Sequence, residues 1–349
     1  MKKLIFVLLT VALICCVVIV RQFISQMEVS NIKEMSYEQA IRYTLQDSKD
    51  GMIAVGTIER GKTDINIFSQ GEQDNNDINT PFEIGSISKT MLGTFIADMA
   101  IKNKLDIERG IFENEKQPNY IDLLTHTSGA DAYYFEMPMI KNTILSNNPF
   151  NGINKEDILQ KYDEIEWKNH QPFSYSNYGY ALLGVAIERN NNLDYTQFMD
   201  QYLKSDLKME DSRVFNNSEK NDSFWQWNDD DSYKAAGAII STPKDMMNYL
   251  KIQIAEKDSA IKLSHQPLRN VEYNEQALIE KGIMVNQIGY GWMIDNQHHY
   301  IWHNGATGNQ NAYIAFSKEE QKGIFILSNL PLKYKASATW IGTKWMQEQ

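Results

Sequence analysis

Patterns of apolar and polar residues predict β-strands in two regions of the sequence, one near each end of the chain. The early stretch, "MIAVGTIERGKTDINIFSQG", alternates on both sides of Arg60-Gly61-Lys62 and predicts a hairpin. Four further strand patterns come late: "GYGWMID" from Gly289, "YIWHNG" from Tyr300, "NAYIAFS" from Asn311 and "GIFILSNL" from Gly323. Because strands occur at both ends, the pattern predicts one antiparallel sheet assembled from both ends of the chain.

Helical patterns flank these strands and fill the middle of the chain. "SYEQAIRYTLQDSKDG" predicts a helix that ends at Gly51, and "YKASATWIGTKWMQ" predicts a closing helix. Residues 104–288 are mostly helical and loop-like, with a clear start signal at Thr242-Pro243. The sequence therefore predicts an α+β fold, in which helices from both ends flank the antiparallel sheet and a mostly helical subdomain is inserted.

The amino-terminal segment is an unbroken apolar run from Leu4 to Val20, preceded by Lys2 and Lys3. As a helix it reaches roughly 25 Å, which is enough to span a thin bilayer. No small-residue cleavage site follows Val20, and this favours an uncleaved anchor over a cleaved signal peptide. Lipid attachment at Cys15 or Cys16 is a third, weaker alternative.

This segment divides the chain into an anchor (1–21), a polar stalk (22–35) and a soluble domain (36–349). The positive charge before the apolar run predicts a cytoplasmic amino terminus. We therefore expect a single-pass protein of the cell membrane, with its soluble domain on the extracytoplasmic side.

Composition and charge exclude several kinds of function. The net charge of the 349-residue chain is −11, which argues against a nucleic-acid partner. Both cysteines lie in the apolar run, so the soluble domain has neither a disulfide nor a thiol nucleophile. There is no H-E-x-x-H motif and no Cys/His cluster, so we expect neither a metal nor a cofactor.

The pattern Ser-x-x-Lys occurs five times, at Ser30, Ser86, Ser205, Ser241 and Ser259. Only Ser86, in "FEIGSISKTMLGTFI", follows a strand hairpin and opens a long apolar helix. Lys89 would lie on the same helix face, and apolar packing would lower its proton affinity so that it could act as a base. The alternative is that Ser86 caps the helix and Lys89 is solvated. This segment alone leaves both interpretations open.

Two other segments carry residues suited to one catalytic site. Tyr175-Ser176-Asn177 precedes an apolar helix, and His303-Asn304-Gly305 ends a predicted strand. Gly305 would let a substrate lie close against the strand backbone. Taken singly, these residues also fit a packed tyrosine, a helix cap and a strand histidine.

Two other histidine positions have structural interpretations. His126, in "LLTHTSG", is predicted to be a structural turn residue, and His298-His299 an exposed hairpin tip.

In this order, Ser86-Ile87-Ser88-Lys89, Tyr175-Ser176-Asn177 and His303-Asn304-Gly305 resemble the motifs of the serine β-lactamase and penicillin-binding-protein superfamily. The tyrosine and histidine resemble the branch that holds class C β-lactamases, D-alanyl-D-alanine peptidases and related esterases. The similarity covers roughly residues 37–345 and includes "YIDLLTHTSGA" and "AAGAIISTPKDMMNYL". It implies a β-lactamase/transpeptidase-like fold.

The resemblance also implies roles for individual residues. Ser86 would be the acylated nucleophile and Lys89 its base, and Tyr175 would pass a proton to the leaving group. Asn177 would hold a substrate amide or carbonyl, and His303 takes a position that is often lysine. The oxyanion would sit between the backbone N–H groups of Ser86 and Ala306.

One departure from the family pattern affects the expected substrate. Asn304 replaces a threonine or serine whose hydroxyl often helps to bind a substrate carboxylate, and an amide differs in reach and shape. This favours an esterase, or a peptidase of altered specificity.

We therefore expect a membrane-anchored serine hydrolase of the cell envelope that acts on D-amino-acid peptides or esters. Its partner would be a small-molecule or peptidoglycan-derived acyl substrate. A β-lactamase, and a catalytically silent relative that binds envelope components, are the alternatives.

Overall fold

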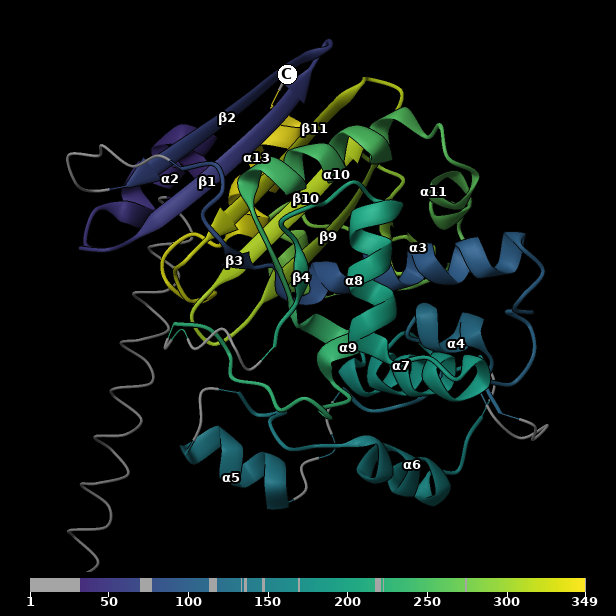
Figure 1. The fold of residues 1–349 in the computed structure, drawn as a ribbon. Helices are drawn as coiled ribbons and strands as arrows, with labels where there is room; N and C mark the ends of the chain where they lie inside the picture. The colour runs from purple at the N-terminus through teal and green to yellow at the C-terminus, as the bar shows by residue number, and fades with distance from the viewer. Residues whose placement is uncertain are drawn as a thin grey trace, which may run out of the picture.

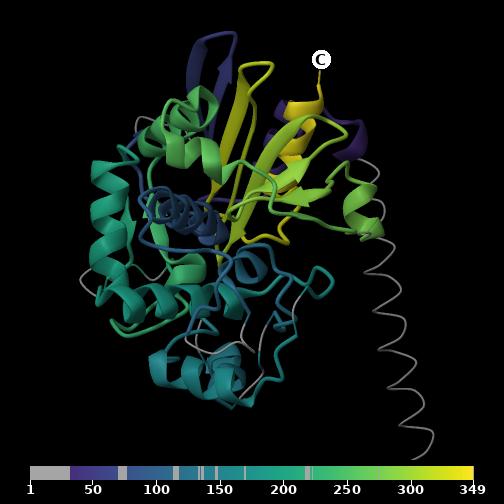
Figure 2. The same cartoon turned by 90° about the vertical axis from the view of Figure 1, so that its right-hand side faces the viewer.

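The computed structural model describes residues 32–69, 77–112, 118–132, 134, 137–145, 148–168, 170–216, 221, 223–273 and 275–348. A large sheet with helices on both faces forms one part of the molecule, and a mostly helical part lies beneath it in Figure 1. Figure 2 shows the same two parts from the side. The predicted α+β arrangement is confirmed.

The main sheet of the described residues has eight antiparallel strands in the order β2-β1-β11-β10-β9-β8-β7-β6. The predicted hairpin is β1 (Met52–Glu59) and β2 (Lys62–Ser69), joined by Arg60 and Gly61 at positive φ, as tight hairpin turns require. β1 pairs with β11, so both ends of the chain contribute to one sheet, as predicted. The remaining strands are β6 (Arg269–Asn270), β7 (Gln287–Ile288), β8 (Met293–Asp295), β9 (Tyr300–Ala306), β10 (Asn311–Ser317) and β11 (Lys322–Ser328).

The central strands are apolar on both faces because helices cover both sides of the sheet. Along β10, Ile314 and Phe316 point into one core cluster, whereas Tyr313 and Ala315 point into the other. This alternation follows the two-residue period of a strand. The helices α2 (Tyr37–Leu45) and α13 (Ala338–Gln347) cover one face, and α10 (Pro243–Ala255) covers the other.

The helix starts follow from local sequence. The Ser36 hydroxyl accepts the N–H of Gln39, and the Gln39 side chain accepts the N–H of Ser36, which together form a capping box for α2. Thr242 caps α10 in the predicted way, with Pro243 in the first turn. α2 ends at Leu45, before the predicted stop at Gly51, because the chain turns there to enter β1.

The helical part is built on α3 (Ser88–Ile101), which packs against α8, α9 and α11. Beside it lies a small antiparallel sheet in the order β3-β5-β4. Its strands have only two or three residues each, too few for a sequence alternation: β3 (Phe82–Glu83), β4 (Arg213–Val214) and β5 (Ile239–Ser241). The other helices are α4 (Tyr120–Leu124), α5 (Met137–Leu145), α6 (Lys155–Glu164), α7 (Asn177–Asn191), α8 (Tyr195–Ser205), α9 (Lys234–Gly237), α11 (Ser259–Ser264) and α12 (Gln276–Ile279).

The helical insert is narrower than the predicted range 104–288. Within that range, β6 and β7 pair onto the main sheet, and α10 packs on its strands β1, β10 and β11. The predicted strand from Gly289 is also shorter, because only Met293–Asp295 form β8. Gly291 has a φ of +80°, which an extended strand does not allow.

A close backbone contact joins the end of β9 to the turn that follows β3. A β-carbon at Gly305 would lie 1.9 Å from the carbonyl oxygen of Ile84. A β-carbon at Gly85, whose φ is +51°, would lie 2.5 Å from the backbone nitrogen of Ala306. Both positions therefore require glycine, and this contact fixes two of the predicted motifs against each other.

The predicted anchor, residues 1–21, lies outside the described residues, as does the stalk up to residue 31. Of the helices that the structure does describe, each is too short or too polar to cross a bilayer.

Candidate active site

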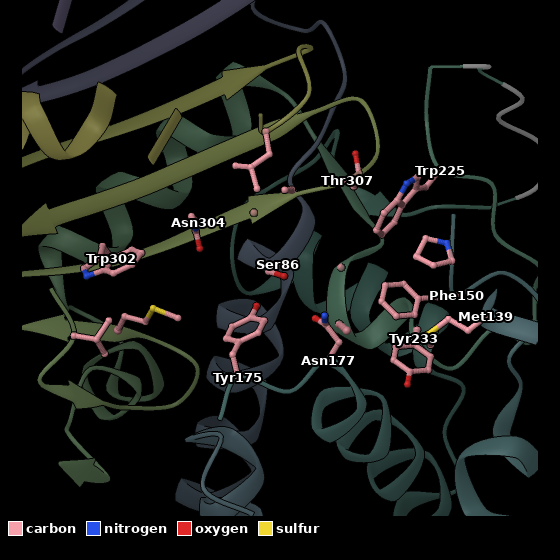
Figure 3. A pocket seen from close by; sticks show the side chains of 18 of the residues that line it. Ser86, Met139, Phe150, Tyr175, Asn177, Trp225, Tyr233, Trp302, Asn304 and Thr307 are labelled. Atoms are coloured by element: carbon pink, nitrogen blue, oxygen red, sulfur yellow. The ribbon is translucent and has the colours of Figure 1, made fainter. Parts of the chain in front are cut away.

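Ser86 lies in a 3₁₀ turn, Gly85–Ile87, that connects β3 to α3. Its side chain is partly exposed and lines a cleft of about 580 Å³ between the main sheet and the helical part (Figure 3). Ser88 anchors the turn, because its hydroxyl donates to the carbonyl of Gly85 and accepts the N–H of Ile239 on β5. The nucleophile candidate is therefore held on a fixed backbone.

Lys89 is completely buried beneath Ser86, at 0% exposure. Its Nζ lies 2.8 Å from Ser86 Oγ, 2.8 Å from Asn177 Oδ1 and 2.6 Å from the carbonyl oxygen of Ala236. Burial lowers the pKa of Lys89 well below its ordinary value of 10.5. The alternative of a capping serine beside a solvated lysine is therefore wrong: Ile87, not Ser86, is the N-cap residue of α3.

These three contacts determine the direction of each hydrogen bond when the amine is neutral. The oxygens of Asn177 and Ala236 only accept, so the two amine hydrogens must point to them. The lone pair of Nζ then faces Ser86 Oγ, and the serine hydroxyl donates its proton to Lys89. This is the arrangement in which a base removes the proton of a nucleophile.

Ser86 differs from the other Ser-x-x-Lys copies that the structure describes. Lys244, which follows Ser241, is exposed and pairs with Asp211 at 2.9 Å. Ser205 and Ser259 are exposed on the surface. Only the copy at Ser86 pairs its serine with a buried lysine.

The motif Tyr175-Ser176-Asn177 enters the cleft at the start of α7. Ser176 is the N-cap residue of this helix, and its hydroxyl accepts the N–H of Gly179. This fixes Asn177 in the first turn, where it is almost fully buried and its Oδ1 accepts from Lys89. The ring of Tyr175 lines the cleft, with its centroid 5.1 Å from Lys89 Nζ.

His126 positions this motif, in agreement with its predicted structural role. Its φ is +58°, its Nδ1 accepts the N–H of Ser176 at 3.0 Å, and its carbonyl accepts the N–H of Ser174. Its ring packs on Tyr175 with centroids 4.4 Å apart. Burial lowers the pKa of His126 well below its ordinary value, so the ring is neutral and Nδ1 stays an acceptor.

The motif His303-Asn304-Gly305 lies on β9, along the opposite wall. His303 is fully buried behind the cleft, and its ring centroid is 6.4 Å from that of Tyr175. Burial lowers the pKa of His303 to about 3, so it supplies no positive charge. Asn304 lines the cleft but donates from Nδ2 to Thr339 Oγ1 on α13 at 3.1 Å.

The structure thus brings every predicted site residue to one place. Ser86, Tyr175, Asn177, Asn304, Gly305 and Ala306 line the cleft, and Lys89 and His303 lie directly behind it. The carbonyl of Ala236 was missed, because a backbone acceptor on α9 leaves no side-chain signal. Among the described residues no cluster of His, Cys, Asp and Glu could hold a metal ion.

Glu83 was also missed, although it lies only three residues before Ser86. Its carboxyl group is buried, with one oxygen accepting the N–H of Trp225 at 2.7 Å and the other the hydroxyl of Thr307 at 2.6 Å. Trp225 and Thr307 both line the cleft, so Glu83 connects two of its walls. Burial raises the pKa of Glu83 to about 7, against the opposing effect of these two hydrogen bonds.

Comparison with known proteins agrees with this geometry. The Beta-lactamase family model matches residues 51–341, well over half of the chain. Protein flp of Staphylococcus aureus (strain MW2) is 23% identical over 287 residues, which cover 73% of this chain and 54% of that protein. The chain therefore spans about half the length of this curated relative.

Solved structures of similar fold lie at lower identity. The octameric penicillin-binding protein homologue from Pyrococcus abyssi superposes with a TM-score of 0.71 at 21% identity, covering 89% of this chain and 76% of that one. A beta-lactamase/D-alanine carboxypeptidase from Yersinia pestis superposes with a TM-score of 0.67 at 15% identity, covering 92% and 98%. These two similarities concern the fold alone.

The first prediction concerns Lys89. Lys89→Met should slow labelling of Ser86 by a fluorophosphonate at least about a hundredfold, because the serine loses its base. In the unmodified protein the labelling rate should rise with pH as Lys89 loses its proton. It should level off well below pH 10.5, because burial lowers the pKa. The matched control is Lys262→Met, in the exposed Ser259-x-x-Lys262 copy. A rate that continues to climb up to pH 10 would contradict a neutral Lys89.

The second prediction concerns Glu83. Its pKa rises from 4.5 in the unfolded chain to about 7 in the fold, so ionisation opposes folding. The protonated carboxyl group of Glu83 makes its full contribution to the free energy of unfolding below pH 4.5. This contribution is lost as the pH rises through about 7. It amounts to roughly 3 kcal/mol. Urea unfolding of Glu83→Gln should show a flatter dependence on pH across this window, whereas Glu59→Gln, at an exposed position, should not. Equal slopes for Glu83→Gln and the unmodified protein would refute this prediction.

Proposed function

The chain belongs to the Beta-lactamase family, and from this premise we propose that it is a serine hydrolase acting through an acyl-serine intermediate at Ser86. The observation that carries the proposal is the buried amine of Lys89, 2.8 Å from Ser86 Oγ. A lysine without a carboxylate neighbour in its hydrogen-bonding shell is costly to bury. Its position is best explained by a need for a neutral amine at the nucleophile.

The reaction would begin with attack of Ser86 Oγ on the substrate carbonyl carbon while the serine proton passes to Lys89. The backbone N–H groups of Ser86 and Ala306 would stabilise the oxyanion. The bond to the leaving group would break as that group takes a proton from Tyr175, which recovers one from Lys89. Water would then attack the acyl carbon, release the acid and return a proton to Ser86.

We propose D-amino-acid peptides or esters as the substrate class, with esters favoured. A carboxylate at the end of a peptide or on a β-lactam needs a cation or several donors. His303 is neutral, and Asn304 already donates to Thr339. Both features weigh against a β-lactamase. A purely binding role would leave the proximity of Lys89 to Ser86 without a purpose.

The third prediction tests the nucleophile. Incubation with p-nitrophenyl esters, D-alanyl esters, D-peptides and nitrocefin should give turnover of esters, with an acyl adduct on Ser86 detected by intact mass. Ser86→Ala should reduce turnover at least about a thousandfold, because no other hydroxyl can form the intermediate. Ser88→Ala, two residues further along the chain, should keep the adduct on Ser86.

Equal fluorophosphonate labelling of the unmodified protein and Ser86→Ala would end the proposal. Rapid nitrocefin turnover would instead favour the β-lactamase alternative. Tight binding of a wall fragment without any turnover would favour the catalytically silent one.

We further propose that residues 1–21 anchor the protein in the cell membrane with its catalytic domain outside. The support is the apolar run from Leu4 to Val20 and the lysines before it.

The fourth prediction tests this location. The full chain should sediment with membranes, and protease added to intact cells should digest its catalytic domain. Deletion of residues 1–21 should abolish sedimentation. Recovery of the full chain in the soluble fraction would contradict the proposal.

A further inference from the structure

The cleft around Ser86 has two apolar ends. In Figure 3, Ser86 lies between Trp302 on one side and Phe150, Tyr233 and Trp225 on the other. All of these residues line the same cleft of about 580 Å³. A substrate that reaches Ser86 therefore has apolar surface available on both sides of its reacting carbonyl.

One end is an aromatic cluster formed by Phe150, Trp225, Trp227 and Tyr233. The ring of Phe150 stacks on Tyr233 at 4.3 Å and on Trp227 at 6.4 Å, and meets Trp225 edge-on at 5.7 Å. Offset stacks and edge contacts of this kind are the favourable geometries for aromatic pairs. The cluster thus presents a flat apolar wall to the cleft.

Polar contacts hold this wall in place. The side chains of Asn148 and Asn151 both donate to the carbonyl of Gln226, at 2.9 and 3.0 Å. The N–H of Trp225 donates to the buried carboxyl of Glu83. Because the two loops that carry the rings are tied to each other and to β3, the wall is formed before a ligand arrives, which lowers the entropic cost of binding.

Charge is missing from the cleft. Of the described residues that line it, none is Asp, Glu, Lys or Arg. Burial lowers the pKa values of the two basic groups behind it, Lys89 and His303, and so disfavours a positive charge on either. A carboxylate on the substrate would lose water without meeting a cation in the described lining, so an uncharged substrate is favoured.

The positions of Tyr175 and Asn177 distinguish the two ends. Tyr175, the proposed proton donor to the leaving group, lies on the Trp302 side of Ser86 in Figure 3, and Asn177 lies on the side of the aromatic cluster. The leaving group must meet Tyr175, so the acyl chain extends the opposite way, past Asn177. This directs the acyl group against Phe150, Trp225 and Tyr233.

We infer that the aromatic cluster is an acyl-binding subsite, and that within the proposed substrate class the protein prefers esters whose acyl group is bulky, aromatic and free of a carboxylate. This inference rests on the proposed acyl-serine chemistry. It adds the chemical class of the acyl group, which the reaction type alone leaves open.

The fifth prediction compares p-nitrophenyl acetate, phenylacetate and 4-carboxyphenylacetate as substrates of the full chain. The kcat/KM for the phenylacetate should exceed that for the acetate about 10- to 100-fold, the gain expected from burying a phenyl ring. The 4-carboxy substituent should remove most of this gain, because its charge enters an uncharged subsite.

Three variants locate the effect. Trp225→Ala keeps the backbone N–H that binds Glu83 and should reduce the phenylacetate-to-acetate ratio to within about threefold, while Trp225→Phe should restore most of it. Tyr273→Ala removes an aromatic ring that lines the same cleft but packs against the core cluster of Trp302 and not that of Phe150, and it should leave the ratio unchanged. An unchanged ratio in Trp225→Ala, or an equal loss in Tyr273→Ala, would overturn the assignment.

Ligand binding to a variant that cannot form the acyl-enzyme tests this inference separately from the proposed function. Calorimetry on Ser86→Ala should detect methyl phenylacetate and give a much weaker signal for methyl acetate. Trp225→Ala in that background should lose the difference. Binding without any turnover in the unmodified protein would refute the proposed function alone. Turnover that depends on Ser86 but shows no preference for the phenyl ring would refute the subsite alone.

Discussion

The structure of the site depends on one buried amine that has no carboxylate among its hydrogen-bond partners. Lys89 contacts three oxygens, two of which can only accept. An ammonium group there would face a desolvation cost with no counter-charge to offset it, so the neutral form is favoured. Neutrality in turn points the lone pair at Ser86, because the acceptors Asn177 and Ala236 take both hydrogens. The direction of proton transfer is therefore set by burial and by the identity of two acceptors.

The surrounding fold holds these acceptors in place. Asn177 is fixed by the start of α7, where Ser176 caps the helix and His126 accepts the N–H of Ser176. Ser86 is fixed by its 3₁₀ turn, which lies against β9 at a contact that admits glycine only at Gly85 and Gly305. Helix α7, the Ser86 turn and β9 are far apart in the sequence. β1 pairs with β11, β11 with β10 and β10 with β9, so strands from both ends of the chain belong to the sheet that carries the β9 wall of the site.

The sequence predicts those features that are repeated or local. The apolar run of β10 and the cap of α10 at Thr242 are visible because each has a residue pattern of its own. The small sheet β3-β5-β4 was missed because its strands are too short to alternate. At the site, Ser86 could be identified from the residue types of the three motifs. The carbonyl of Ala236 could not, because every residue has a backbone carbonyl. The burial of Glu83 likewise arises from contacts with segments distant in sequence, which local patterns do not encode.

Charge appears in this cleft only as the reaction proceeds. Before acylation, burial disfavours a charge on Lys89 and His303 behind the cleft, and the walls present rings, amides and hydroxyls. Attack by Ser86 would create a cation on Lys89 and an oxyanion on the substrate at the same moment, and the apolar walls would strengthen their attraction. A substrate that brought its own carboxylate would add a third charge that lacks a partner. The features that make Lys89 a base and those that favour an uncharged acyl group are therefore one property of the site: burial disfavours charge on Lys89 and His303, and the described lining holds no Asp, Glu, Lys or Arg.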